Sequence, residues 1–135
     1  MKAKVILYWV VTIISALELL AGAEWDLTHR PNVLGVVTQL GYPVYLLTIL
    51  GIWKVLAVLA LLVPGFPRLK EWAYAGVFFE MTGAAASFGA KGDFRGLIGP
   101  LVFAAFAMAS WALRPQNRTL GELFPAKKPA LAREG

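Results

Sequence analysis

Four long apolar stretches constrain the fold of this chain more than any other feature of its sequence. They cover residues 5–23, 43–63, 72–90 and 97–113, so each is 17–21 residues long. An α-helix of about 20 residues crosses a hydrocarbon core of roughly 30 Å, whereas the strands of membrane β-barrels are shorter and alternate in polarity. The pattern predicts an all-α fold in which residues 1–113 form a bundle of four transmembrane helices.

The composition indicates that a lipid bilayer is the solvent of this bundle. The chain has 135 residues, enough for one domain, and 59% of them are hydrophobic while only 16% are charged. An ordinary soluble domain has about 25% charged residues, and a small domain has too much surface for its volume to hide so many apolar side chains. We therefore expect the lipid bilayer to be a partner of the outer surface.

The cysteine and histidine content excludes several cofactors. The chain has no cysteine and a single histidine, His29. Disulfides, thiol redox chemistry and cysteine-ligated zinc or iron–sulfur clusters are excluded for the chain by itself. A haem held by two histidines of one copy is excluded as well. We expect no metal site and no cofactor held covalently or by metal ligands, and we expect His29 to be an ordinary loop residue.

Basic residues predict the orientation of the four stretches. Nine of the thirteen Lys and Arg residues precede the first stretch, follow the fourth, or lie between the second and third. Three lie on the opposite side, and Lys54 lies inside a stretch. The positive-inside rule then places both termini in the cytoplasm, with residues 114–135 as a polar tail. Because these basic residues flank apolar stretches, no nucleic-acid partner is needed to explain them.

A secretory signal is an alternative interpretation of the first stretch. Two lysines precede an apolar run that ends in the small residues AGA at 21–23, as they would in a cleaved signal. The run is longer than a usual signal core and contains Glu18. We therefore expect the segment to stay in the protein as a transmembrane helix.

The links between the stretches predict two further features. Pro31 is suited to begin a short helix with an apolar stripe, and Gly41 and Pro43 mark a break before the second stretch. We expect this short helix to lie at the membrane interface, over the outer mouth of the bundle. The segment PGFPR at 64–68 is a tight turn, so the second and third stretches should be antiparallel neighbours.

Three ionisable residues lie within the apolar stretches, namely Glu18, Lys54 and Glu80. A charge at the centre of a bilayer costs roughly 2.5–3.5 kcal/mol even on the mildest scale, so such residues usually pair or have a function. At about 1.5 Å per residue, Lys54 and Glu80 lie at the same depth near the midplane, and we expect them to form an ion pair. Glu18 is nearer the outer end of its stretch, so we expect it to lie above the pair without a partner.

Small residues near Glu80 predict which way this part of the third stretch faces. Gly76, Gly83 and Ser87 recur at helical spacing around it. Because small residues let membrane helices approach closely, we expect this stripe to face the interior of the bundle.

Two interpretations of the three ionisable residues stay open. Lys54 and Glu80 can be a structural ion pair that fixes the register of the helices. Alternatively, Glu18, Lys54 and Glu80 form a ligand-binding or proton-relay site. Glu18 favours the second interpretation, because one acid neutralises Lys54 and a further acid needs a role, such as holding an exchangeable proton.

Several motifs resemble the DoxX-like family of small bacterial membrane proteins. The likeness is carried by LGYPVY at 40–45, the glycine and lysine of LGIWKVLA at 50–57, PRLKEWAYAG at 67–76 and LRP at 113–115. It is strongest over residues 41–86 and covers the layout of four stretches. The resemblance implies a four-helix bundle that passes several times through the bacterial cytoplasmic (inner) membrane.

The resemblance also implies site residues and partners. Lys54 and the Gly-Tyr-Pro turn around Tyr42 match the family and are carried over, while Tyr45 and Gly51 lie in the same motifs as supporting residues. Relatives often have Ser-His where this chain has serine and phenylalanine at 87–88, so no histidine role is carried over. The better-known relatives are membrane subunits associated with thiosulfate:quinone oxidoreductase or terminal quinol oxidase systems, which implies a quinone and a redox protein partner.

Three functional hypotheses follow. In the first, the protein is a component of a quinone-linked oxidoreductase, in which Lys54 donates a hydrogen bond to a quinone carbonyl and Glu80 or Glu18 relays protons, while a partner supplies electrons. In the second, it is a non-enzymatic binding or assembly module, with another protein or as a homo-oligomer, and the ion pair is structural. In the third, weaker because the chain has no inverted repeat, it is a small-solute or proton transporter.

Overall fold

A computed structural model of the chain describes residues 2–115 and 118–119. Within these two ranges the chain forms five α-helices and no β-strand: α1 (Lys2–Leu27), α2 (Pro31–Leu40), α3 (Tyr45–Leu62), α4 (Pro67–Ala90) and α5 (Ile98–Leu113). The predicted all-α fold is confirmed for this part of the chain. Most of the predicted polar tail, residues 116–117 and 120–135, lies outside the described residues.

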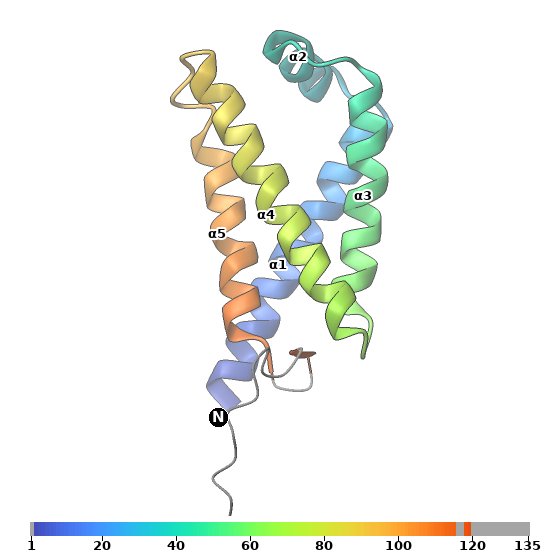
Figure 1. Ribbon diagram of the computed structural model, residues 1–135, viewed down its shortest axis with the longest axis vertical. Helices are drawn as coiled ribbons and strands as arrows, with labels where there is room; N and C mark the ends of the chain where they lie inside the picture. The colour runs from blue at the N-terminus through green and yellow to red at the C-terminus, as the bar shows by residue number, and fades with distance from the viewer. Residues whose placement is uncertain (1, 116–117, 120–135) are drawn as a thin grey trace, which may run out of the picture.

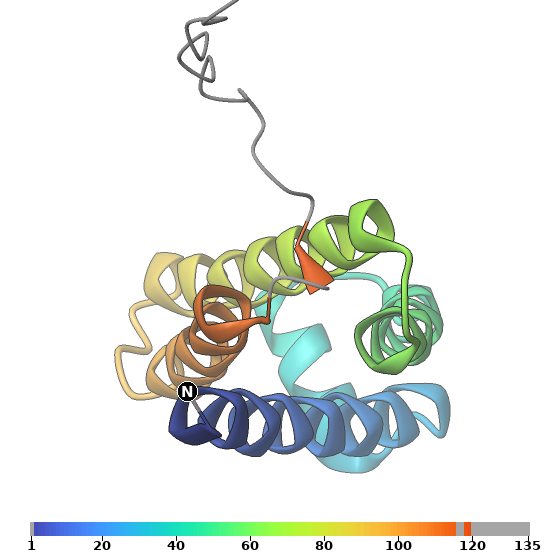
Figure 2. The same cartoon turned by 90° about the horizontal axis from the view of Figure 1, so that it is seen from below.

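The four long helices form a bundle, and the short one lies across one end of it. Figure 1 shows α2 at the end of the molecule far from the N-terminus, while the end of α5 lies at the same end as the N-terminus. Seen along the bundle, α1 and α4 lie on opposite sides, with α3 and α5 between them (Figure 2). Helices α3 and α4 are antiparallel neighbours, as the tight turn between them predicts.

The helix boundaries differ from the predicted stretches by a turn or more at two places. Helix α1 continues to Leu27, one turn beyond the predicted end at residue 23. Helix α4 begins at Pro67 rather than at residue 72, because a proline fits the first position of a helix, where its missing N–H is not needed. The predicted short helix is confirmed as α2, which ends at Gly41 in the left-handed conformation (φ 89°) that glycine adopts without steric strain.

Two of the five helices, α1 and α3, are long and apolar enough by themselves to cross a membrane. Helix α5 is apolar but has only 16 residues. Helix α4 has 24 residues, but it includes charged residues in its first turns and Glu80 in its second half. Two helices could thus each cross a membrane, and the four-span arrangement stays a prediction.

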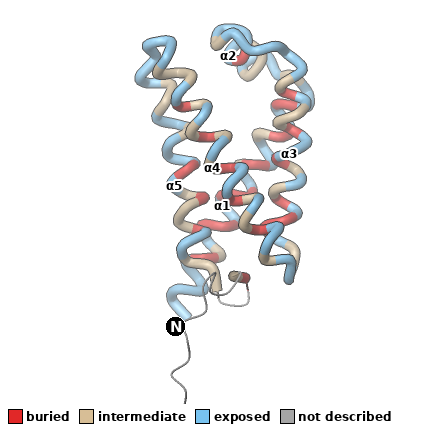
Figure 3. Tube along the Cα trace, viewed as in Figure 1, coloured by how far each residue is buried: buried red, intermediate tan, exposed pale blue. Residues whose placement is uncertain are grey.

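The distribution of polar and apolar side chains is that of a protein surrounded by lipid. Large apolar side chains cover the outside, among them Leu17, Trp53 and Phe79, which are 62%, 62% and 70% exposed. Buried positions, drawn in red in Figure 3, include several polar residues, among them Thr12, Ser15, Lys54 and Ser110. Soluble proteins rarely expose contiguous apolar surface of this extent, so the surface indicates contact with lipid.

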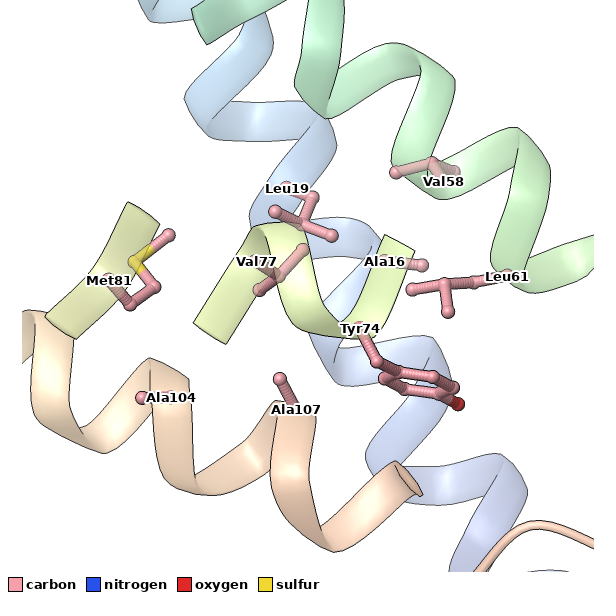
Figure 4. Close-up of a cluster of buried hydrophobic side chains, with 9 residues drawn as sticks. All are labelled: Ala16, Leu19, Val58, Leu61, Tyr74, Val77, Met81, Ala104 and Ala107. Atoms are coloured by element: carbon pink, nitrogen blue, oxygen red, sulfur yellow. The ribbon is translucent and has the colours of Figure 1, made fainter. Parts of the chain in front are cut away.

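A small apolar core lies where α4 crosses the other helices at mid-height. Figure 4 shows its buried members, which come from all four long helices: Ala16, Leu19, Val58, Leu61, Tyr74, Val77, Met81, Ala104 and Ala107. Three of them are alanines, which allow the close helix contacts that stabilise bundles in lipid. This core holds α1, α3 and α4 together next to their charged residues.

Two basic side chains stabilise the end of α3. Lys70 is only 1% exposed, and its Nζ donates hydrogen bonds to the carbonyl oxygens of Ala60, at 2.9 Å, and Val63. Arg118 donates to the carbonyl of Leu61 at 2.9 Å and is 8% exposed. The last carbonyls of a helix lack partners within it and carry partial negative charge, so both contacts are favourable. The start of the predicted polar tail is therefore packed on the bundle at Arg118.

Candidate functional site

Lys54 lies at the centre of an ion-pair network that joins three helices. Its Nζ is 2.5 Å from Oδ2 of Asp26 on α1 and 2.7 Å from Oε1 of Glu80 on α4. The side chains of Lys54, Asp26 and Glu80 are 10%, 6% and 18% exposed. We call these three residues the Lys54 cluster. The predicted pair between Lys54 and Glu80 is thus confirmed, and it is one half of a larger arrangement.

Asp26 is the site residue that the sequence prediction missed. It lies beyond the predicted end of the first stretch, and it enters the site because α1 continues for one more turn. The sequence spacing indicates that Asp26 faces the site, since Glu18, Gly22 and Asp26 recur every four residues and so share one face of a helix. Gly22 adjoins Lys54, because a Cβ on this glycine would lie 3.4 Å from both Cδ and Cε of the lysine.

Gly51 precedes Lys54 by about one turn of α3 and brings α1 and α3 together next to the cluster. A Cβ at this position would lie 2.7 Å from Cγ of Leu27 and 3.3 Å from the carbonyl oxygen of Ala23. Because real side chains do not approach so closely, only glycine allows this contact between the two helices. Gly51 therefore supports the site by setting the distance across which Lys54 reaches Asp26.

The position of Glu18 differs from the prediction. We expected it between Lys54 and the outer mouth, but the lysine side chain passes Gly22 and ends at Asp26, both of which follow Glu18 along α1. Glu18 therefore lies on the opposite side of Lys54, toward the end that holds the N-terminus. The prediction failed because it placed the end of α1 too early. Glu18 is half-buried, and its carboxylate has no ion pair or hydrogen bond with any residue that the structure describes.

The acids around Lys54 outnumber the bases. Glu18, Asp26 and Glu80 are within electrostatic range of one ammonium group. Excess negative charge is costly in a medium of low dielectric constant, and acids that share a site commonly hold a proton between them. An arrangement of this kind has the chemical capacity to bind and release a proton.

A cavity of about 660 Å³ reaches the Lys54 cluster from the side, between α3 and α4. Its inner end includes Lys54 and Glu80, and its outer part is formed by large apolar side chains that are mostly exposed on the bundle surface: Trp53, Leu56, Leu69, Trp72 and Phe79. Glu18 is not among its lining residues. The cavity therefore opens at the side of the bundle, among apolar side chains that face the surroundings.

The two glycines of the small-residue stripe on α4 do not face the bundle interior. Gly76 and Gly83 are exposed, and a Cβ added to either glycine would meet nothing within 4 Å. The prediction that they allow close packing of helices is therefore wrong. Gly76 lines the cavity, and its missing side chain leaves that part of the cavity open.

Two further predicted residues lie together at the end of the bundle that α2 covers. The hydroxyl of Tyr42 is 2.6 Å from Oγ of Ser87, so the link between α2 and α3 is hydrogen-bonded to the last turns of α4. His29 bonds Oγ1 of Thr48 at 3.0 Å, which ties the link after α1 to α3. Tyr45 does not join the site, because it is 68% exposed.

No metal site is apparent in the part of the chain that the structure describes. No three of its His, Asp or Glu side chains are arranged to hold a metal ion.

Comparison with known proteins gives a family match. A model of the DoxX-like family matches residues 10–110, well over half of the chain. The matched range includes Glu18, the Lys54 cluster and every residue that lines the lateral cavity. No curated protein and no solved structure matches the chain.

Proposed function

Because the chain belongs to the DoxX-like family and is a membrane protein, we propose that it binds a membrane quinone between α3 and α4, as a component of a quinone-linked oxidoreductase. The observation that carries this proposal is the lateral cavity, which is apolar and open to lipid over most of its length and ends at Lys54 and Glu80.

The shape of the cavity suits a ligand that is dissolved in the bilayer. Its volume of about 660 Å³ lies within the usual range of small-molecule sites, roughly 300–1,000 Å³. A ligand entering from lipid needs an apolar tail, and Trp53, Trp72 and Phe79 offer aromatic surface to such a tail. A quinone has a tail of this kind and a flat polar head, so it matches both parts of the cavity.

The inner end of the cavity supplies the groups that a quinone head needs. An ammonium group has three N–H donors, and Asp26 and Glu80 accept two of those of Lys54. The third donor is available for a quinone carbonyl oxygen. Reduction of a quinone to a quinol takes two electrons and two protons. In this proposal the acids around Lys54 pass on the protons, and a redox protein partner supplies the electrons.

The proposed placement in the membrane follows the charges and the fold. Helices α1, α3, α4 and α5 cross the bacterial inner membrane, both termini are cytoplasmic, and α2 lies at the outer interface. The N-terminus and the end of α5 lie at one end of the bundle, which supports an even number of crossings.

A second candidate function is a non-enzymatic assembly module. The observation that favours it is the Lys54 cluster itself, because an ion pair that joins three helices also fixes their register. In that case the cavity receives an acyl chain or the helix of a partner, and no quinone binds with measurable affinity.

Tryptophan fluorescence tests the quinone proposal. Quinones quench indole fluorescence at short range, and two of the five tryptophans, Trp53 and Trp72, line the cavity. In lipid nanodiscs we expect saturable quenching by a short-chain quinone, most of it lost when Trp53 and Trp72 are both replaced by phenylalanine and retained in Trp25→Phe. Lys54→Met should weaken the apparent affinity by about tenfold, since a hydrogen bond to a charged group contributes roughly 1.5–3 kcal/mol.

The control for Lys54→Met is Lys91→Met, which removes an exposed lysine after α4. Quenching that rises linearly with quinone and is the same in all variants would reflect partition into lipid, and it would refute the proposal in favour of the assembly module.

A further inference from the structure

A second group of buried polar side chains lies between the apolar core and the end that holds the N-terminus. The hydroxyl of Tyr74 is 2.7 Å from Oγ of Ser110, which is 2.6 Å from Oγ1 of Thr12. These residues are 2%, 1% and 0% exposed. Tyr8, which is 1% exposed, interacts with the Tyr74 hydroxyl. Helices α1, α4 and α5 thus contribute a continuous series of hydroxyls, which we call the hydroxyl chain (Tyr74, Ser110 and Thr12).

Ser15 lies between this hydroxyl chain and Glu18. It is 5% exposed, and its Oγ has no hydrogen-bond partner among the residues that the structure describes. On α1 it follows Thr12 by three residues and precedes Glu18 by three, so its side chain is a neighbour of each of them on the helix surface. Buried hydroxyls are nearly always hydrogen-bonded, so a water molecule is the partner that we expect for this Oγ.

Polar groups therefore follow the inner face of α1 from the hydroxyl chain to the Lys54 cluster. From Thr12 through Ser15 and Glu18 to Asp26 they span about 21 Å at 1.5 Å per residue. The apolar core, with Ala16 and Leu19 on the same helix (Figure 4), lies beside them. Apolar side chains cannot carry protons, whereas this series places polar side chains along α1 between the two polar groups of the bundle.

We propose that this series carries protons from the end of the bundle that holds the N-terminus to the acids around Lys54. Each hydroxyl gives its own proton to the next acceptor and takes one from the preceding donor, and the carboxylate of Glu18 binds the proton that arrives. The charged group of the described chain that interacts electrostatically with Glu18 is the ammonium of Lys54, which is paired with Asp26 and Glu80. The role of the route rests on the proposed quinone site, since reduction of a quinone consumes protons.

Infrared spectroscopy tests the route without any quinone. A protonated carboxyl group has a C=O band that shifts when the protein is transferred from H₂O to D₂O, and Glu18→Gln identifies the band of Glu18. In nanodiscs, Ser15→Ala should slow the shift of this band by about tenfold or more, because the remaining gap is too long for one hydrogen bond. Thr12→Val should have the same effect.

Ser15→Ala is the decisive variant, because this hydroxyl can be removed without breaking a hydrogen bond to any residue that the structure describes. A purely structural role of Ser15 thus predicts no change in the exchange rate. The matched control is Thr82→Val, since the Thr82 hydroxyl bonds only the carbonyls of Phe78 and Phe79 on its own helix.

Equal exchange rates in wild type and Ser15→Ala would overturn the proposal, and so would equal slowing in Thr82→Val. The absence of a protonated Glu18 band across the neutral and mildly acidic pH range would overturn it as well. Because no quinone is present, failure of quinone binding does not affect this result, and failure of the route does not affect tryptophan quenching.

Discussion

The Nζ of Lys54 lies 2.5 Å from Oδ2 of Asp26, so the end of α1 is bonded to the middle of α3. The same Nζ lies 2.7 Å from Glu80 on α4. One ammonium group thus links α1 to α3 and α4, the two helices that line the lateral cavity. Both the stability of the bundle and the proposed chemistry depend on this arrangement.

Replacing Lys54 by methionine should destabilise the protein strongly. The variant leaves two buried acids without their partner, and removal of one member of a buried ion pair typically costs about 3–5 kcal/mol. The free energy of unfolding, measured by titration with a denaturing detergent, should fall by an amount in this range. Lys91→Met should leave it nearly unchanged, and a small effect of Lys54→Met would mean that the cluster does not stabilise the bundle.

Asp26 and Glu18 should respond differently to neutralisation. Asp26→Asn weakens a hydrogen bond to a charged group, and such a bond contributes roughly 1.5–3 kcal/mol. The free energy of unfolding should therefore fall in Asp26→Asn. Glu18→Gln removes a carboxylate that has no partner in the described chain, so the same titration should show an unchanged or slightly higher stability. An equal loss in both variants would contradict the positions assigned to these two acids.

Gly51 and Gly76 provide a matched pair of glycine substitutions. Gly51→Ala places a methyl group against Leu27 and Ala23, and overpacking of this kind costs about 1–3 kcal/mol. Gly76→Ala meets no neighbour within 4 Å, and alanine is favoured over glycine in a helix by up to about 1 kcal/mol. Thermal unfolding in detergent should therefore show a lower midpoint for the first variant and an unchanged or higher midpoint for the second.

The sequence predicted the fold more fully than the site. The length of the apolar stretches predicted the four long helices, and the turn at 64–68 predicted that α3 and α4 are neighbours. Equal depth on neighbouring helices predicted the pair of Lys54 and Glu80. Depth can be counted from the sequence, because the rise of a helix per residue is constant.

The rest of the site depends on details that hydropathy does not contain. The end of α1 was placed at residue 23 because the apolar run stops there, and this error excluded Asp26 and misplaced Glu18. The glycines at 76 and 83 suggested close packing, but a glycine stripe can equally leave space beside a cavity. The bonds from Lys70 to the end of α3 could not be predicted, since a basic residue after a span is expected to face the cytoplasm.

The hydrogen bond between Tyr42 and Ser87 should hold the end of the bundle beneath α2. Tyr42→Phe and Ser87→Ala each remove one partner, and a double-mutant cycle should give a coupling of about 0.5–1.5 kcal/mol. Hydrogen exchange of the backbone amides at 40–48 should be faster in either variant. Unchanged exchange in both variants would show that this bond does not order the link between α2 and α3.

Quinone binding to Gly76→Leu and Gly83→Leu tests the central claim most directly. Both glycines are exposed on α4 with no neighbour within 4 Å of an added Cβ, but only Gly76 lines the cavity. Gly76→Leu should therefore abolish the saturable quenching of tryptophan fluorescence by a short-chain quinone, while Gly83→Leu retains the affinity of the wild type. Equal affinity in the two variants would contradict a quinone site between α3 and α4.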